Sequence, residues 1–153
     1  MRRKEKEIKS KTEIESIINS GQVCRVAFSL NDEPYIVPMY YGHRDNFLYF
    51  HSAKQGKKID IIKKNNRVCF EIDINHHIIN TGVPCNWKNS YSSVIGFGKA
   101  KLVENFSEKV KALNSIIDHY SPGTIYKFPK ENVIKTEIIK IEIEEITGKK
   151  SSD

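Results

Sequence analysis

Three side chains between residues 52 and 58 have the chemistry and spacing to hold a phosphate group. Ser52 follows a strand-like aromatic run, and Lys57 and Lys58 open the next helix-like segment. A hydroxyl group, two ammonium groups and a helix N-terminus together suit a phosphate dianion. Each charge-assisted contact contributes about 1.5 to 3 kcal/mol, so micromolar binding, at roughly 8 kcal/mol, also needs a buried ring. The alternative is a solvent-exposed, lysine-rich helix.

His51 precedes Ser52 and therefore lies beside the expected phosphate position. An imidazole there could contact the phosphate, orient a bound substrate, or donate a proton to a reduced product as a catalytic residue. A histidine held by structural hydrogen bonds is the simpler alternative. The other histidines do not show the spacing of metal ligands, so we expect no metal site.

The run from Val37 to Tyr40 could bind the ring of a phosphate-bearing cofactor. Pro38 has no backbone N–H group, which suits an edge strand better than a fully paired central strand. Unpaired backbone groups at such an edge can bond the polar rim of a heterocycle while neighbouring side chains cover its face. The residues concerned are Val37, Pro38, Met39 and Tyr40. A simple edge strand without a ligand is the alternative.

Hydrophobic periodicity predicts the elements that would position these residues. Alternation indicates strands at residues 23–30, 35–42, 47–51, 67–73 and 91–104, and a last strand around residues 139–143. Helical spacing indicates helices at residues 12–20, 53–65 and 110–120. We expect the strands at 35–42 and 47–51 to pair as an antiparallel hairpin. We expect residues 76–89 to form the longest loop, suited to a lid or a partner contact.

Five or six strands joined mostly by hairpins, with about three helices, predict a mostly β fold of the α+β class. An antiparallel barrel packed with helices fits this order better than a parallel sheet does. The length of 153 residues suits a single domain spanning residues 1–153. We find no internal repeat, linker or low-complexity segment.

Composition and charge limit the classes of partner. The chain is 39% hydrophobic and 29% charged, and it has no apolar run long enough to span a membrane. The charged N-terminus lacks the apolar centre of a signal peptide, so we expect a cytoplasmic protein that does not bind membranes. A net charge of +6 raises the possibility of nucleic-acid binding. Because acidic residues are interspersed with the lysines, we attribute most of this charge to a solvated surface and expect no nucleic-acid partner.

Common catalytic motifs are missing from the sequence. There is no Walker loop, no GxSxG elbow and no HExxH motif. Gly96-Phe97-Gly98 lacks the third glycine and the following helix of a dinucleotide fingerprint. Glycines in a strand pattern instead predict a bulge or a close backbone approach.

Four segments together resemble the pyridoxamine 5'-phosphate oxidase-like FMN-binding split barrels, and in particular their nitroimidazole-resistance (Nim) branch. The segments are CRVAF, PYIVPMYYG, LYFHSAKQGKKIDIIKKNNRVCFEID and SVIGFGKAKLVE. They occur in consistent order within residues 1–147. The most specific pieces are FHSA followed by GKK, and the IGFGKA strand.

The resemblance implies an FMN-binding homodimer with each flavin at the subunit interface. It implies that the strand containing Val37, Pro38, Met39 and Tyr40 lines the isoalloxazine ring. It places His51, Ser52, Lys57 and Lys58 around the ribityl phosphate, and it makes Ser93 a further flavin contact.

The sequence departs from the pyridoxamine phosphate oxidases proper, which hold the substrate phosphate with C-terminal arginine and histidine residues. No arginine follows Arg67 in this chain. We therefore expect an FMN-dependent oxidoreductase that reduces small acceptors, such as nitroaromatic or nitroimidazole compounds, through flavin N5. A non-catalytic flavin or haem carrier is the alternative, since the fold can hold a ligand without turning over a substrate.

Overall fold

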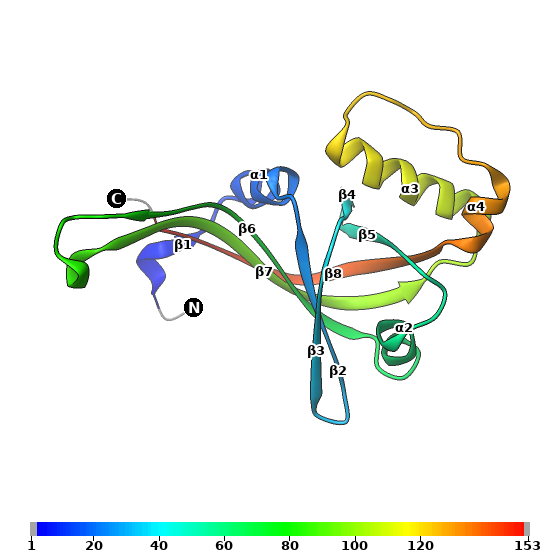
Figure 1. Cartoon of the computed structure of the whole chain (residues 1–153), viewed down its shortest axis with the longest axis horizontal. Helices are drawn as coiled ribbons and strands as arrows, with labels where there is room; N and C mark the ends of the chain where they lie inside the picture. Colours follow the sequence, from blue (N-terminus) through cyan, green and yellow to red (C-terminus); the bar gives the residue numbers. More distant parts are fainter. Residues whose placement is uncertain (1–2, 152–153) are drawn as a thin grey trace.

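The computed structural model describes residues 3–151 as one antiparallel eight-stranded sheet with four α-helices (Figure 1). The strands are β1 (Glu7–Ile8), β2 (Cys24–Leu30), β3 (Glu33–Met39), β4 (Gly42–Arg44), β5 (Phe47–Ser52), β6 (Arg67–Ile79), β7 (Lys88–Leu102) and β8 (Glu137–Ser151). The helices are α1 (Lys11–Ser20), α2 (Lys57–Ile62), α3 (Phe106–Tyr120) and α4 (Lys130–Lys135). The sheet order is β3-β2-β6-β7-β8-β5-β4, and β1 pairs with β8.

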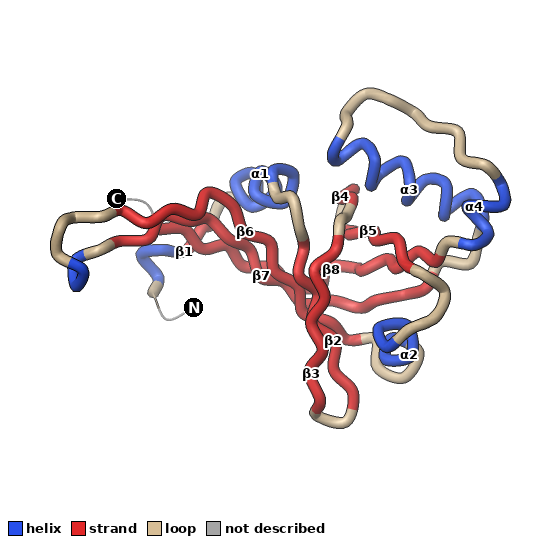
Figure 2. Tube along the Cα trace, viewed as in Figure 1, coloured by secondary structure: helices blue, strands red, loops and turns tan. Residues whose placement is uncertain are grey.

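The three longest strands give the molecule an extended arm beside a more compact body. β6, β7 and β8 run side by side out of the body, and the β6–β7 connection forms the far end (Figure 2). We call this extension, residues 74–91 with residues 146–151 of β8, the arm. In the body, α3 packs on β4 and β5, and α2 packs on β2.

The core forms because apolar residues alternate along each strand and face inward. Fully buried members from five different elements are Val26, Phe28, Phe50, Ile59, Phe70, Ile72 and Ile141. Tyr41 is also fully buried, and its hydroxyl lies within hydrogen-bond distance of the Ile18 and Gly21 carbonyl oxygens. This residue therefore ties the end of β3 to the start of β2.

The predicted hairpin between residues 35–42 and 47–51 is wrong in its first strand. β3 pairs with β2 and ends at Met39, whereas the hairpin partner of β5 is the short β4. The chain turns between these strands because Tyr41 points into the core, which interrupts the extended run. As a result β3 lies at one end of the sheet and β4 at the other.

The predicted long loop at residues 76–89 is also wrong. β6 continues to Ile79 and β7 begins at Lys88, so only residues 80–87 connect them, with a 3-10 turn at Pro84–Asn86. The ladder shifts register between Ile74 and His77, where Asn75 has φ 60°. Much of this segment is exposed on both faces, so it lacks the apolar alternation by which strands are recognised.

The helix predicted over residues 53–65 is shorter than expected. α2 covers only Lys57–Ile62, because Gly56 has φ 129° and the helix can begin only after it. Its three buried isoleucines still face the core as their spacing predicts.

Gly98 confirms the expectation of a bulge and a close backbone approach. The β7–β8 register shifts between Phe97 and Gly98. A Cβ atom at Gly98 would lie 2.0 Å from the Glu142 carbonyl oxygen. Only glycine fits this point, which lies in the body, where Gly98 pairs with Val68 of β6 and Ile143 of β8.

The face of β3, β2, β6 and β7 that is turned away from the core, here called the outer face, carries an uninterrupted apolar row. Ile36, Ala27, Cys69 and Phe97 are successive cross-strand partners. Ile36 is 62% exposed and Phe97 is 45% exposed. Exposed apolar residues aligned in this way are typical of an interaction surface rather than of isolated surface positions.

The predicted fold class, mostly β and antiparallel with helices, is confirmed. The structure has four α-helices where about three were expected, and α4 is the additional one. Within residues 3–151, none of the helices has the length and apolar character needed to cross a membrane.

Candidate functional site

The structure brings His51, Ser52, Lys57 and Lys58 together where β5 ends and α2 begins; we call this group the phosphate end. β5 stops at Ser52, and Gly56 adopts a left-handed conformation directly before Lys57. The side chain of Ser52 is buried, and its hydroxyl donates to the Ala53 carbonyl oxygen over 2.9 Å. His51, one residue earlier, points to the other face and is exposed, with no hydrogen bond or ion pair to any residue in 3–151.

Lys57 connects the phosphate end to the start of β3. Its Nζ atom donates to Glu33 Oε1 over 2.6 Å and lies 5.0 Å from the centre of the Tyr35 ring. The hydrogen bond from Lys57 and its positive charge lower the pKa of the Glu33 carboxyl group. Lys58 makes no ion pair with the described residues. One ammonium group is thus shared with a carboxylate and the other is available to a ligand.

β3 has the free edge that Pro38 predicts. Among the strands of residues 3–151 it pairs with β2 alone and lies at the end of the sheet, so the expectation of an edge strand is confirmed. Val37 and Met39 pack against the core, whereas Pro38 faces outward. Tyr40 is exposed and meets Tyr120 edge to face, with ring centres 5.3 Å apart. An unpaired backbone edge therefore lies next to the cationic phosphate end.

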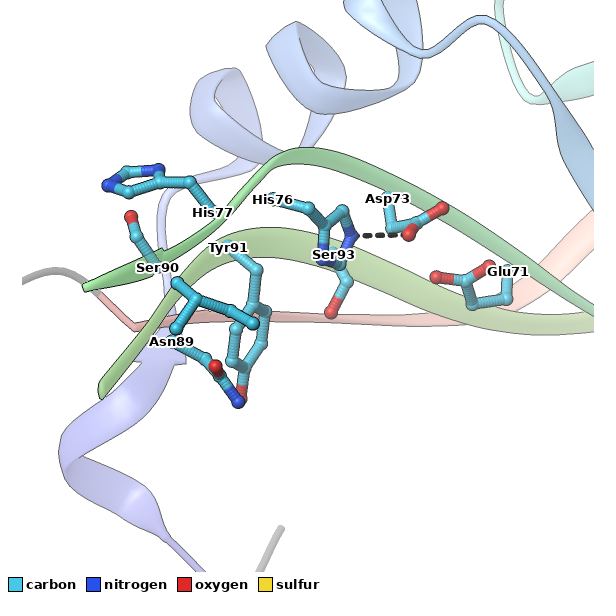
Figure 3. A pocket seen from close by; sticks show the side chains of 9 residues that line it. Glu71, Asp73, His76, His77, Asn89, Ser90, Tyr91 and Ser93 are labelled. Carbon is cyan, nitrogen blue, oxygen red and sulfur yellow. Dashed lines mark ion pairs between the residues drawn. The ribbon is translucent and has the colours of Figure 1, made fainter. Parts of the chain in front are cut away.

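Ser93 lies apart from the other predicted site residues. It lines a shallow cavity of about 480 Å³ on the outer face, where the arm leaves the body (Figure 3). We call this cavity the arm pocket. Its lining residues come from β6 and β7 and are Glu71, Asp73, His76, His77, Ile78, Asn89, Ser90, Tyr91 and Ser93.

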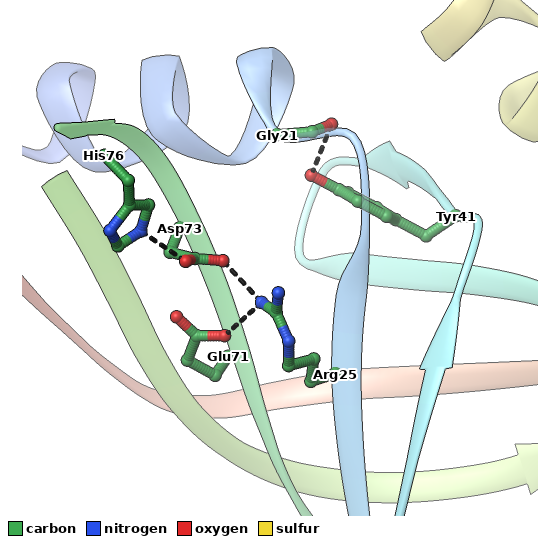
Figure 4. A network of polar contacts seen from close by, with 6 residues as sticks. All are labelled: Gly21, Arg25, Tyr41, Glu71, Asp73 and His76. Atoms are coloured by element: carbon green, nitrogen blue, oxygen red, sulfur yellow. Dashed lines mark hydrogen bonds and ion pairs between the residues drawn. The ribbon is translucent and has the colours of Figure 1, made fainter. Parts of the chain in front are cut away.

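A network of charged groups runs along the edge of the arm pocket (Figure 4). Arg25 Nη1 donates to Glu71 Oε2 over 3.0 Å and also to Asp73 Oδ1. The second carboxylate oxygen of Asp73 pairs with Nε2 of His76. These contacts link four side chains in series, in the order Glu71, Arg25, Asp73 and His76. Arg25 lies on β2 and the other three lie on the neighbouring strand β6.

The β-bulge at Asn75 explains why His76 can reach Asp73. In a regular strand, residues three apart point to opposite faces. The register shift beside Asn75, with its positive φ, returns His76 to the face that carries Asp73. The His76 ring then lies nearly parallel to Tyr91, with an interplanar angle of 11° and 6.1 Å between ring centres.

Burial and like charge act together on Glu71. Partial burial raises the pKa of this carboxyl group, the neighbouring Asp73 raises it further, and Arg25 opposes both effects. The sequence alone does not predict a site that contains Arg25, Glu71, Asp73, His76 or Tyr91. The available signal was a polar side chain at every second position of strand 67–73, together with a turn-forming Asn75 in a strand-like run.

Residues 3–151 contain no cluster of three or more histidine, cysteine or acidic side chains that could hold a metal ion. In the arm pocket, Asp73 is instead paired with His76, and both Glu71 and Asp73 are paired with Arg25.

The family model for pyridoxamine 5'-phosphate oxidase matches residues 10–150. The chain belongs to this family. The family predicted from the sequence motifs is therefore confirmed. A curated relative, the uncharacterized protein RA0666 from Rhizobium meliloti, is 37% identical over 65 residues. That match covers 42% of each chain, so it spans less than half of the relative's length.

Two solved structures extend the comparison to almost the whole chain. A candidate 5-nitroimidazole antibiotic resistance protein from Bacteroides thetaiotaomicron is 31% identical, with a TM-score of 0.84, and the match covers 94% of this chain and 85% of that one. The flavocytochrome Anf3 from Azotobacter vinelandii is 16% identical, with a TM-score of 0.86, over 100% of this chain and 72% of that one. The second likeness shows a shared fold only.

Proposed function

We propose that the protein binds FMN and acts as an oxidoreductase that passes electrons from the flavin to a small acceptor. The observation that supports this most strongly is the contact between the phosphate end and β3. Lys57 touches both Glu33 and Tyr35, so a cationic site and a free strand edge adjoin although 18 residues or more separate them in the sequence. Membership of the pyridoxamine 5'-phosphate oxidase family supports the same conclusion.

The residues present fit an FMN molecule at this place. Lys57, Lys58 and the hydroxyl of Ser52 would hold the phosphate, with His51 beside them. The isoalloxazine ring would lie along Val37, Pro38, Met39 and Tyr40, where the unpaired edge of β3 can bond its polar rim. When bound, the flavin supplies the two-electron chemistry, and the protein supplies binding, orientation and shielding.

We also propose that the protein works as a homodimer whose outer faces pack together. Neighbouring strands lie about 4.8 Å apart, so Ser93 on β7 is three strands, or about 14 Å, from β3 of its own chain. A ring bound at the free edge of β3 cannot also touch that serine. The exposed apolar row of Ile36, Ala27, Cys69 and Phe97 provides a self-complementary surface that would bring Ser93 of the second copy to the flavin.

The acceptor we favour is a nitroaromatic or nitroimidazole compound. The relative from Bacteroides thetaiotaomicron carries a 5-nitroimidazole resistance description and matches nearly the whole chain. The lack of arginine after Arg67 argues against a phosphate-bearing pyridoxine substrate.

The visible spectrum before and after adding FMN tests the cofactor. We expect flavin bands that shift when FMN binds. A protein that stays colourless and leaves the FMN spectrum unchanged would contradict the proposal, and a haem spectrum would favour the carrier alternative. Anaerobic reoxidation of the dithionite-reduced holoprotein by a nitroimidazole then tests the acceptor. A flavin that stays reduced would limit the protein to flavin binding.

A further inference from the structure

We propose that His76 of one subunit delivers a proton to the acceptor that is being reduced at the flavin of the other subunit. This inference rests on the proposed function and assigns a task to the arm pocket. Two observations support the inference. They are the geometry of the Arg25–Asp73–His76 network and the distance between that network and β3 of the same chain.

Asp73 determines which nitrogen of His76 is available. An ionised carboxylate only accepts hydrogen bonds, so His76 Nε2 must carry the proton that it shares with Asp73. Asp73 is itself held by Arg25, which keeps its carboxylate from turning away. The remaining ring nitrogen, Nδ1, is therefore the atom that can exchange a proton with a ligand.

The surroundings of His76 suit a planar acceptor. Its side chain is 58% exposed, so a ligand can reach the ring. Tyr91 lies parallel to it on β7, and the Lys149 Nζ atom lies 5.6 Å from the centre of the Tyr91 ring. The hydroxyl of Ser93 lines the same cavity. The arm pocket thus offers a flat aromatic wall, a proton donor and hydroxyl groups at one opening.

His76 cannot serve a flavin bound to its own chain. β6 is separated from β3 by β2, which alone places the two backbones about 10 Å apart. Met39, the last residue of β3, aligns through Cys24 with Ile72, so His76 also lies beyond the end of β3. The apolar row and the arm pocket share the outer face. Packing two outer faces together therefore brings the arm pocket of one copy to the β3 of the other.

The proton balance of nitro reduction requires such a donor. Conversion of a nitro group to a nitroso group consumes two electrons and two protons and releases water. When bound, a reduced flavin would supply the two electrons and one of the protons. Protonated His76 supplies the second proton from Nδ1, becomes neutral, and takes up a proton from solvent. Within residues 3–151, the side chain of His51 has no partner that orients it, whereas His76 is oriented by Asp73.

Mixed dimers test the proposal directly. His76→Gln keeps an N–H donor for Asp73 but cannot deliver a proton, so the dithionite-reduced holoprotein should be reoxidised by a nitroimidazole about 100-fold more slowly. Its affinity for FMN should be unchanged. A second variant, Lys57→Ala with Lys58→Ala, should bind FMN too weakly to be occupied when FMN is limiting, but should keep its arm pocket. When the two variants are mixed as equal amounts of refolded chains, about half of the bound flavin should recover the wild-type rate, because random pairing places it opposite an intact His76.

Each outcome of the mixing experiment decides something. No recovery in the mixed dimers would overturn action across the interface, and normal reoxidation in His76→Gln would overturn the role of His76 itself. His43→Gln, a change on β4 at the other end of the sheet, is the matched control and should leave the rate unaltered.

An FMN-independent measurement separates this inference from the proposed function. In ¹⁵N NMR spectra of the flavin-free protein, neutral His76 should carry its proton on Nε2, and Asp73→Asn should change that preference. Addition of 4-nitrobenzyl alcohol should shift the His76 and Tyr91 signals. If these signals stay unchanged while FMN still binds, the inference fails and the proposed function stands. If the signals shift but FMN does not bind, the proposed function fails, and the flavin-linked role of His76 fails with it.

Discussion

The phosphate end and the arm pocket differ in how completely their charged side chains are paired within the protein. At the phosphate end, Lys57 has one carboxylate partner and Lys58 has none within the described chain. At the arm pocket, Asp73 contacts both Arg25 and His76, so the three side chains form a linear series. The first arrangement leaves cations available to a ligand, whereas the second keeps side chains oriented before any ligand arrives.

The two regions also differ in how they are assembled. The phosphate end comes from residues 51–58, a single stretch between one strand and one helix. The arm pocket combines β6 and β7 with Arg25 of β2 and depends on a bulge. A site formed by one short stretch of sequence tolerates changes elsewhere in the fold. A site whose residues meet through strand pairing is lost when the register of that pairing changes. The predictions below test this contrast.

The largest expected effect is on FMN affinity at the phosphate end. Lys57→Ala with Lys58→Ala should weaken FMN binding by about 30- to 100-fold, because two charge-assisted contacts are lost at a partly solvated site. Flavin fluorescence titration measures the change. Lys63→Ala with Lys64→Ala, just beyond the other end of α2, is the control and should bind FMN normally. Equal affinity in both double variants would place the phosphate elsewhere.

The next effect is on the pairing of β7 with β8 in the body. Gly98→Ala places a Cβ atom 2.0 Å from the Glu142 carbonyl oxygen, so β7 and β8 must move apart. We expect the free energy of unfolding in urea to fall by about 2 to 3 kcal/mol. Gly56→Ala meets no atom within 4 Å and carries only a conformational penalty of about 1 kcal/mol. If Gly56→Ala lowered the free energy of unfolding more than Gly98→Ala does, the close approach of Gly98 to Glu142 would not be the stronger constraint on the fold.

A smaller and pH-dependent effect is expected for Arg25→Ala. Without the guanidinium group, Glu71 loses its positively charged partner beside Asp73, and the pKa of Glu71, already raised, rises further. The folded state then binds more protons than the unfolded state above the ordinary value of 4.5. Stability therefore falls as the pH rises through that range. Since the Arg25 side chain is 45% exposed, we expect a loss of only about 1 kcal/mol at pH 7.

Urea unfolding at pH 7 and pH 4 measures this dependence. The difference between Arg25→Ala and wild type should shrink at pH 4, below the raised pKa of Glu71, where that carboxyl group takes up its proton. An equal loss at both pH values would assign the role of Arg25 to packing rather than to charge.

The smallest effect is expected at Glu33. Its carboxylate occupies Lys57 and would repel a phosphate dianion. Glu33→Gln should therefore tighten FMN binding about two- to fivefold, in keeping with the weakness of exposed ion pairs. Riboflavin, which lacks the phosphate, should bind wild type and variant equally well. Weaker FMN binding in the variant would show instead that Glu33 positions Lys57 for the ligand.

The sequence predicted the local parts of the fold well and the long-range pairing poorly. The spacing of Ile59, Ile61 and Ile62 identified α2 as a helix with a buried face, and the missing N–H of Pro38 identified an edge strand. The hairpin assigned to residues 35–51 was wrong because Tyr41 turns into a core built by distant segments. The long loop was wrong because the arm forms strands without an apolar face.

The residues of the candidate site also fall into two groups, those that the sequence predicted and those that it did not. The phosphate end was predicted because Ser52, Lys57 and Lys58 lie close together in the sequence, where residue type and spacing are direct signals. Its role in FMN binding stays a prediction. Asp73, His76 and Arg25 gave no comparable signal. Their meeting depends on the pairing of β2 with β6 and on the shifted register beside Asn75.

The sequence by itself therefore determined the antiparallel, mostly β class, the family and the cationic cluster at residues 52–58, because these follow from periodicity and from neighbouring residue types. Only the tertiary structure decided that β3 and β5 lie far apart in the sheet, that an apolar row crosses the outer face, and that Asp73 joins Arg25 to His76. The physical reason is that strand register and a single bulge determine which distant side chains share a face, and neither is encoded by any short stretch of residues.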